Sequence, residues 1–168
     1  MLRTLCFAAL LTATASNARG DVLWHNPKTD QVAIWMMNGT SIVPGGAPIQ
    51  GTKDEGWKAI AAGDFNGDGK ADILWHSSSS DRVAVWLMNG SKIVSAGSAI
   101  QGAKDEGWKA VGTGDFDGDG KADILWHNLK TDQVAVWLMN GTKLVSAGSA
   151  IQGAKNEGWK VVGAGAFR

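Results

Sequence analysis

A strict period of 51 residues runs through this chain and limits the folds that it can adopt. Residues 72–117 and 123–168 differ at only 12 of 46 aligned positions. Such a period indicates one supersecondary unit that is stacked several times, and we place the units at about 21–71, 72–122 and 123–168. The residues that recur in phase are Trp24, Trp75 and Trp126; Trp35, Trp86 and Trp137; Trp57, Trp108 and Trp159; and His25, His76 and His127.

Each unit is predicted to contain four short antiparallel strands. Apolar, β-branched and aromatic residues follow a period of two rather than 3.6, and turn residues bound each run. The Asn-Gly pair at 89–90 lies between two such runs, where we expect a type I′ hairpin turn. Strands that are apolar on both faces suit a blade held between two neighbours. The predicted fold is therefore all-β, a β-propeller of which this chain holds about three four-stranded blades; a parallel solenoid is the second choice.

Two acidic, glycine-rich segments occupy the same place in successive units. They read Asp-Phe-Asn-Gly-Asp-Gly-Lys-Ala-Asp at 64–72 and Asp-Phe-Asp-Gly-Asp-Gly-Lys-Ala-Asp at 115–123. Because glycine accepts positive φ, oxygens at loop positions one, three, five and nine can converge on one hard cation. The backbone carbonyl of position seven, Lys70 or Lys121, would be a further ligand, its ammonium pointing to solvent. The ligand count favours Ca²⁺ over Mg²⁺, and the alternative is a turn that binds no metal.

Two other loop types fit these segments poorly. An EF-hand needs a glutamate at position twelve, where Trp75 and Trp126 stand, and flanking helices, for which the periodicity gives no sign. A phosphate-binding P-loop needs a glycine where Asp64 and Asp115 stand, and a Ser or Thr after its lysine, where alanine follows.

The acidic loop, preceded by a strand and followed by Ile-Leu-Trp-His, resembles the FG-GAP/VCBS repeat of integrin α-chain propellers and PVL-type lectins. The resemblance covers residues 21–168. It implies a structural Ca²⁺ in each of the two complete loops, between the first and second strands of a blade. The side-chain ligands that it implies are Asp64, Asn66, Asp68, Asp72, Asp115, Asp117, Asp119 and Asp123.

The third copy of the loop departs from this pattern, because Ala166 stands where the first ligand belongs. No third complete site is therefore expected. The first unit opens on a second-strand segment at 21–25, whereas a first-strand segment recurs at 159–163. Three repeats are fewer than the roughly four to eight blades of a closed ring. We expect either a homo-oligomer that completes the ring by strand exchange, or a part of a larger propeller.

Residues 1–18 are predicted to be a secretory signal. Arg3 precedes the apolar run 5–11, and small residues allow cleavage after Ala15 or Ala18; a short buried strand or helix is the alternative. The single cysteine, Cys6, lies in this segment, so the exported chain would hold no disulfide. The expected location is secreted, periplasmic or at the cell surface, without a membrane span. The equal numbers of basic and acidic side chains, 16 of each, argue against nucleic acid as a partner.

The repeat favours a non-catalytic binding or adhesion module over an enzyme. Catalysis needs one asymmetric constellation, whereas nearly every polar residue here recurs once per unit. Tryptophan faces can stack on sugars, and the resemblance to lectin and integrin propellers implies glycans or extracellular protein surfaces as ligands. The alternative role of every tryptophan is inter-blade packing, and the alternative role of every histidine is structural. The candidate ligand-binding residues are Trp57, Trp108, Trp159, His25, His76 and His127. Of the three recurring tryptophan sets, we expect the set Trp57, Trp108 and Trp159 to be the most exposed.

Two other functions are consistent with the sequence. The chain could be an architectural piece with no ligand of its own, or an accessory domain of a polysaccharide-active enzyme. Asn-Gly-Ser/Thr at 38–40, 89–91 and 140–142 also matches the N-glycosylation pattern, but the hairpin turn accounts for these residues.

Overall fold

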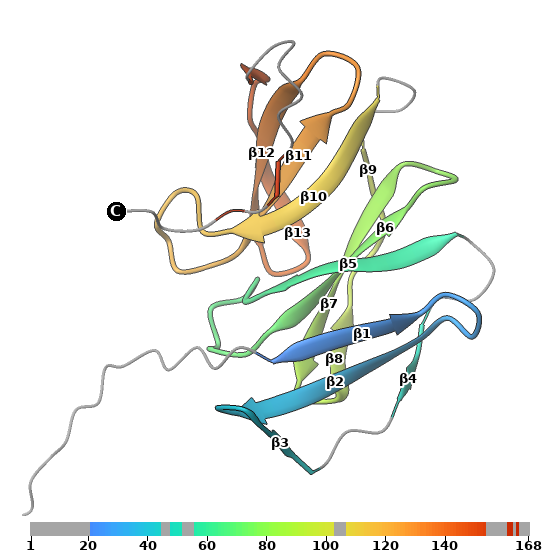
Figure 1. Cartoon of the computed structure of the whole chain (residues 1–168). Helices are drawn as coiled ribbons and strands as arrows, with labels where there is room; N and C mark the ends of the chain where they lie inside the picture. Colours follow the sequence, from blue (N-terminus) through green and yellow to red (C-terminus); the bar gives the residue numbers. More distant parts are fainter. Residues whose placement is uncertain are drawn as a thin grey trace, which may run out of the picture.

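The computed structural model of the chain is all-β and confirms the predicted fold class. It describes residues 21–44, 48–51, 56–102, 107–153, 161–162 and 164, so the predicted signal, Trp159 and Ala166 lie outside the described residues. Three antiparallel sheets follow one another in chain order, from blue through green to orange in Figure 1. The described residues include no helix that is long and apolar enough to cross a membrane.

The second sheet is one complete blade. It runs β5 (Trp57–Gly63), β6 (Asp72–Ser77), β7 (Arg82–Asn89) and β8 (Lys92–Ala96) as an antiparallel meander. These strands match the predicted runs to within a residue. A short strand, β9 (Ile100–Gln101), also pairs with the start of β7. The sequence did not predict β9. It is separate from β8 because the outer strand breaks at Gly97, whose N–H donates to Val85 O at 2.9 Å.

The third sheet repeats this blade, and the first sheet repeats all of it except the first strand. The third consists of β10 (Trp108–Gly114), β11 (Asp123–Asn128), β12 (Gln133–Asn140), β13 (Lys143–Ala147) and β14 (Ile151–Gln152). The first consists of β1 (Val22–Asn26), β2 (Gln31–Asn38), β3 (Ser41–Val43) and β4 (Ile49–Gln50). In the described part of the chain β1 pairs with β2 alone, and the three sheets do not close into a ring.

The hairpin turns differ from the predicted type. Asn89 pairs with Lys92, so the two central residues are Gly90 and Ser91 rather than Asn89 and Gly90. Among these, only Gly90 has positive φ, at 58°. Positive φ at the first central residue alone is the pattern of a type II′ turn, which matches the twist of the strands as well as type I′ does. Gly39 and Gly141 repeat it, each with φ 61°.

The strict alternation of side chains sends each blade toward two different neighbours. Ile73 and Trp75 on β6 pack in the cluster between the first and second sheets, whereas Leu74 packs in the cluster between the second and third. The ring of Trp75 lies edge-on to His25 at 6.0 Å, and that of Trp126 lies edge-on to His76 at 6.2 Å. Inter-blade packing is thus the role of Trp75 and Trp126, which are 1% and 2% exposed.

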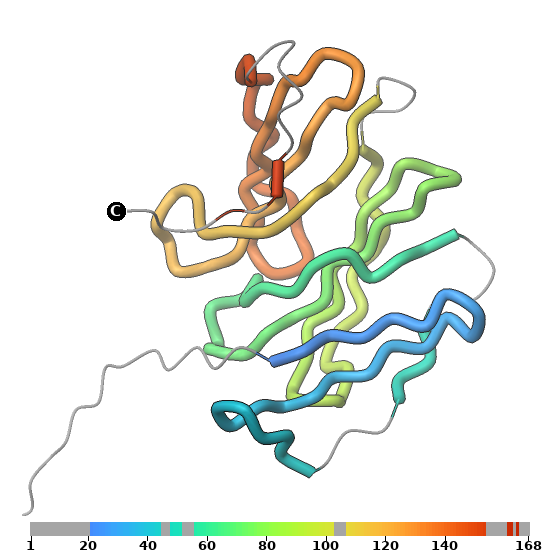
Figure 2. Tube along the Cα trace, viewed as in Figure 1, coloured from blue at the N-terminus to red at the C-terminus, as the bar shows by residue number. Residues whose placement is uncertain are grey.

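The first strands of consecutive blades also lie side by side, as the paths of β5 and β10 in Figure 2 show. Thr113 Oγ1 donates to Ala62 O at 2.8 Å, across a sequence separation of 51. At the other end of these strands, Lys109 Nζ lies 3.4 Å from Asp81 Oδ1 in the preceding blade. Both contacts join the second blade to the third.

The expectation that Trp57, Trp108 and Trp159 form the most exposed tryptophan set is wrong for the described members. Trp57 is buried and Trp108 is half-buried, whereas Trp24 is 48% exposed and Trp35 is 41% exposed. The cause is place along the chain rather than place within the repeat. Trp24 and Trp35 face the side of the first sheet on which the described residues supply no further blade.

We predict that Gly102→Ala destabilises the fold by about 1–3 kcal/mol, the usual cost of forcing extra atoms into packed space. A Cβ at Gly102 would stand 2.3 Å from Asp81 O and 2.9 Å from Cη2 of Trp126 in the next blade. Gly112→Ala is the control, because a Cβ there has no neighbour within 4 Å among the described residues. Urea unfolding measures both, and equal midpoints for the two variants would contradict the stacking account.

Candidate metal centre

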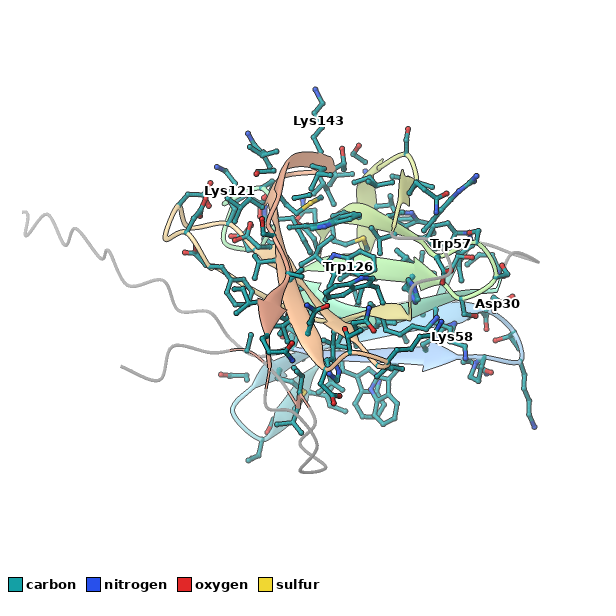
Figure 3. The ribbon with its side chains drawn as sticks, turned by 90° about the horizontal axis from the view of Figure 1, so that it is seen from above. Asp30, Trp57, Lys58, Lys121, Trp126 and Lys143 are labelled. Carbon is teal, nitrogen blue, oxygen red and sulfur yellow. The ribbon has the colours of Figure 1, made fainter. Side chains whose placement is uncertain are left out.

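The two acidic loops join the first and second strands of the second and third blades, as predicted. Residues 64–71 connect β5 to β6, and residues 115–122 connect β10 to β11. Both loops lie at the left side of the molecule in Figure 1, whereas the β1–β2 and β6–β7 turns lie at the right. Figure 3 likewise places Lys121 on the opposite side of the view from Asp30. The loops therefore lie on the same side of the stack of blades.

The carboxylate of the first loop position organises the backbone around itself. Asp115 Oδ1 accepts from Gly118 N at 2.7 Å, and its Oδ2 accepts from Gly120 N at 3.0 Å. Both donors are glycines with positive φ, 81° and 84°, where another residue would be strained. The first loop repeats this arrangement, with Gly67 and Gly69 each donating to Asp64 at 2.7 Å. The glycine spacing thus wraps the loop around a carboxylate.

The second loop brings three carboxylates together. One oxygen from each of Asp115, Asp117 and Asp123 lies within 4.8 Å of the other two. Ligands that each stand 2.3–2.6 Å from one Ca²⁺ are at most about 5 Å apart, so this spacing suits a common calcium ion. All three donors are hard oxygens, as that cation prefers. The residues therefore fit the predicted metal, with Asp115 and Asp117 open to solvent.

The last loop position has a second role that was not predicted from the sequence. Asp123 is 1% exposed, and its Oδ2 and Oδ1 accept from Phe116 N and Met139 N, each at 2.9 Å. Asp72 does the same with Phe65 N at 2.9 Å and Met88 N at 2.8 Å. In the first sheet Asp21 holds Met37 N at 2.8 Å, although no acidic loop precedes it. This carboxylate therefore braces the loop and the following hairpin in its own right.

Burial sets the protonation tendency of these bracing carboxylates. It raises the pKa of Asp72 and of Asp123 above the ordinary aspartate value, and the two backbone N–H donors of each oppose that effect. Neighbouring loop carboxylates raise the pKa of both further. A bound cation would offset this repulsion, because it favours the ionised form of every nearby carboxylate.

The fifth loop position pairs with the lysine of the seventh. Asp119 Oδ2 lies 2.7 Å from Lys121 Nζ, and Asp68 Oδ2 lies 3.3 Å from Lys70 Nζ. Both ion pairs lie at the surface, so the prediction that these ammonium groups point to solvent is compatible with a carboxylate two residues away within their reach. This hydrogen bond lowers the pKa of Asp119 and raises that of Lys121. Asp119 is a predicted ligand, and a cation at this site would compete with Lys121 for its oxygen.

The first loop carries one carboxylate fewer than the second. Asn66 replaces an aspartate at position three, and its Oδ1 accepts from Asp68 N at 3.0 Å, as Asp117 Oδ1 accepts from Asp119 N at 3.1 Å. The backbone of the two loops is thus held in the same way. The difference lies in charge, and we expect weaker cation binding at the first loop, because a neutral amide replaces an anion.

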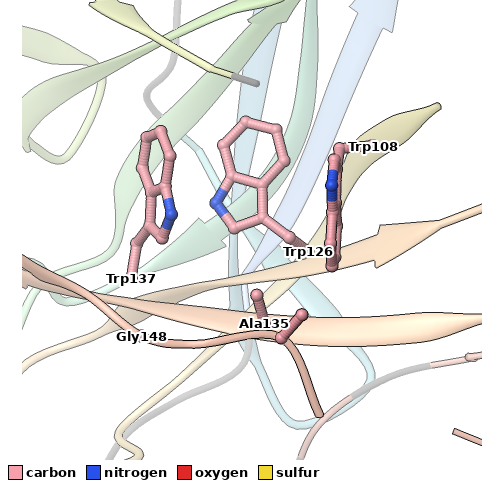
Figure 4. A pocket seen from close by; sticks show the side chains of 6 residues that line it. Trp108, Trp126, Ala135, Trp137 and Gly148 are labelled. Atoms are coloured by element: carbon pink, nitrogen blue, oxygen red, sulfur yellow. The ribbon is translucent and has the colours of Figure 1, made fainter. Parts of the chain in front are cut away.

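The candidate ligand-binding residues divide into two groups. His76 and His127 are 6% and 7% exposed, and His25 is half-buried, which favours a structural role for all three. Burial lowers the pKa of His76, and Lys109 lowers it further. Trp108 instead lines a pocket of about 170 Å³ on the third sheet, together with Trp126, Ala135, Trp137, Gly148 and Ala150. Figure 4 shows the three indole rings side by side along it.

We predict that Asp123→Ala destabilises the fold even in a calcium chelator. The buried N–H of Met139 and the part-buried N–H of Phe116 would lose their acceptor, and a buried unsatisfied group costs about 1–3 kcal/mol. Asp119→Ala is the control, since its carboxylate is exposed and accepts no bond from a buried group. Urea unfolding in EDTA tests the pair, and an unchanged midpoint for Asp123→Ala would restrict this residue to metal binding.

Comparison with known proteins gives one family. The FG-GAP-like repeat matches residues 17–75 and 76–126, which together make up more than half of the chain. No curated protein and no solved structure shows a significant match. The two matched segments, the three-sheet architecture and the acidic loops between first and second strands agree, and the chain belongs to the FG-GAP-like repeat family.

Proposed function

We propose that this chain is an exported, calcium-stabilised β-propeller module that binds glycans or extracellular protein surfaces without catalysis. The observation that carries the calcium part is the pre-shaped second loop, with oxygens of Asp115, Asp117 and Asp123 within 4.8 Å of one another. The signal predicted at residues 1–18 supports export. A binding role is supported by the repeated tryptophan pockets, since repetition suits several equal sites better than one reaction centre.

Calcium would act on blade stacking as well as on the loop that holds it. Asp64 O accepts from Ala122 N at 2.6 Å, and Phe65 O accepts from Gly141 N at 2.7 Å, so the first loop lies against the third sheet. Phe65 itself is fully buried in the cluster between the second and third sheets. A cation held by Asp64, Asn66, Asp68, Asp72 and the Lys70 carbonyl would fix this contact. In the second loop the predicted donors are Asp115, Asp117, Asp119, Asp123 and the Lys121 carbonyl.

The tryptophan pockets recur at equivalent positions of two sheets. A pocket of about 380 Å³ in the first sheet is lined by Trp24, Ala33 and Pro48, among others. These correspond to Trp126, Ala135 and Ala150 in the pocket of about 170 Å³ on the third sheet. An indole face beside small side chains leaves room for the apolar face of a sugar ring. Weak sites of this kind gain strength when a glycan meets several of them at once.

The calcium proposal predicts that the full chain unfolds at a higher temperature in Ca²⁺ than in EDTA. A cation at a hundred times its dissociation constant adds about 2.7 kcal/mol per site, because it binds the folded state alone. Titration calorimetry should count two ions per chain, and Asp115→Ala should remove one of them. Asp117→Asn is the matched variant, since it gives the second loop the ligand set of the first and should weaken that site without abolishing it. The same unfolding temperature in both solutions would overturn the calcium role.

The ligand proposal predicts binding on a panel of extracellular glycans, with quenching of tryptophan fluorescence. Trp108→Ala should reduce this binding, because Trp108 lines the pocket on the third sheet, half-buried rather than enclosed. Unfolding of the same variant serves as the control for folding. If no glycan binds, or if Trp108→Ala binds as well as the parent chain, the glycan part of the proposal fails and a protein ligand or an architectural role replaces it.

A further inference from the structure

The first sheet offers an open strand edge and an open apolar face. By its repeat position β1 corresponds to β6, whose second edge is paired along its whole length with β5. Within the described residues nothing pairs with the equivalent edge of β1. On the adjoining face Val22 is 38% exposed and Trp24 is 48% exposed, whereas their counterparts Ile73 and Trp75 are 1% exposed. The contacts that cover β6 from the preceding blade thus have no equivalent at β1.

The contacts made by Trp75 and Trp126 define what would cover Trp24. Each ring sits on a glycine of the preceding blade: a Cβ at Gly51 would stand 2.8 Å from Trp75 Cη2, and one at Gly102 would stand 2.9 Å from Trp126 Cη2. Gly153 is the next glycine in this series, and its N–H donates to Asp132 O at 3.0 Å, as Gly102 N donates to Asp81 O at 2.9 Å. In the described part of the chain no tryptophan lies within 4 Å of a Cβ placed at Gly153. The far side of the third sheet therefore presents the seat that Trp24 lacks.

The sequence of the strand that β1 lacks is also present in the chain. Residues 159–165 repeat the sequence pattern of β5 and β10. A Cβ added at Gly114 would lie 3.2 Å from the Cβ of Ala164. In the same way, a Cβ added at Gly63, one repeat earlier, would lie 3.3 Å from the Cβ of Thr113. Ala164 is thus placed beside β10 as Thr113 of β10 is placed beside β5. Val162 is 98% exposed, although its counterpart Ile60 packs against the core between the second and third sheets.

We propose that the open face of the first sheet binds the far side of the third sheet in a second copy of this chain, with the 159–164 segment of that copy pairing with β1. The interface is heterologous, and two copies related in this way supply six sheets, within the roughly four to eight that close a propeller. The proposal extends the homo-oligomer expected above to a defined pair of surfaces. It rests on the propeller fold and requires neither calcium nor a glycan, and it would cover the pocket at Trp24, so that the glycan proposal would then depend on the pocket at Trp108.

The β5–β6 ladder fixes the register of the new pair. Ala62 opposes Ile73, so Ala164 of one copy would oppose Val22 of the other. Opposed residues of an antiparallel ladder have Cα atoms about 4.5–5.5 Å apart, within the range that a disulfide spans. Val22 and Ala164 can therefore be tested as a cysteine pair.

The test uses two differently tagged full-length chains, both with Cys6→Ser. One carries Val22→Cys and the other Ala164→Cys, so a disulfide between the tags can form only between copies. After mixing and mild oxidation we expect a cross-linked dimer on non-reducing gels. The pair Leu23→Cys with Ala164→Cys is the control and should link far less, because Leu23 points to the opposite face. A disulfide that forms only within a chain carrying both Val22→Cys and Ala164→Cys, or no disulfide at all, overturns the proposal.

Native mass gives a second readout that does not depend on cysteine chemistry. The parent chain should have the mass of two copies, and Trp24→Arg should shift it to one, because a buried charge replaces the seated indole. Val94→Arg is the matched control, since Val94 is 64% exposed on β8 of the second sheet, away from both surfaces. A parent chain with the mass of one copy contradicts the proposal. Calcium-dependent unfolding is measured on the same samples, so failure of the assembly and failure of the calcium role are told apart.

Discussion

The packing of one tryptophan per blade onto the preceding blade is the contact on which the rest of this structure depends. Trp75 and Trp126 each occupy a site made by a glycine that has no room for a Cβ and a histidine that meets the ring edge-on. A short four-stranded sheet buries too little surface to stand alone. The tryptophan joins two such sheets into one core, and each ring is packed further against a second tryptophan, at 4.7 Å for Trp86 and 4.6 Å for Trp137.

The acidic loops depend on this stacking and support it in return. Carbonyls of Asp64 and Phe65 accept bonds from the third sheet, while Asp72 holds the loop to the β6–β7 hairpin. The loop is therefore held on both sides before any cation binds. A calcium ion would add charge neutralisation to a backbone that its own glycines and carboxylates already shape, which keeps the entropic cost of binding low.

The sequence predicted the repeat, the strands and the loop positions because each leaves a local signature. Period-two alternation and in-phase glycines specify β6, β7 and the acidic loops without tertiary information. The sequence could not predict the features that depend on neighbouring blades. The exposure of Trp24 and the burial of Trp57 follow from which blades flank a sheet, and two copies of one motif give no sign of that difference. The bracing role of Asp72 was hidden for another reason, since the same carboxylate also completes a metal-ligand pattern; Asp21, which recurs without an acidic loop before it, was the available clue.

A strictly repeated sequence carries a structural consequence at its two ends. When every unit offers a tryptophan on one face and its glycine seat on the other, each contact between described blades satisfies one of each, and within the described residues the ring of Trp24 and the seat at Gly153 are left without each other's counterpart. An exposed strand edge beside an exposed indole favours association, and open edges of this kind are usually blunted by charge or proline. Neither occurs within β1, whose sequence is Val-Leu-Trp-His-Asn. A partner that repeats the same geometry would satisfy the edge, the ring and the glycine seat together, which is why the proposed partner is another copy of the chain.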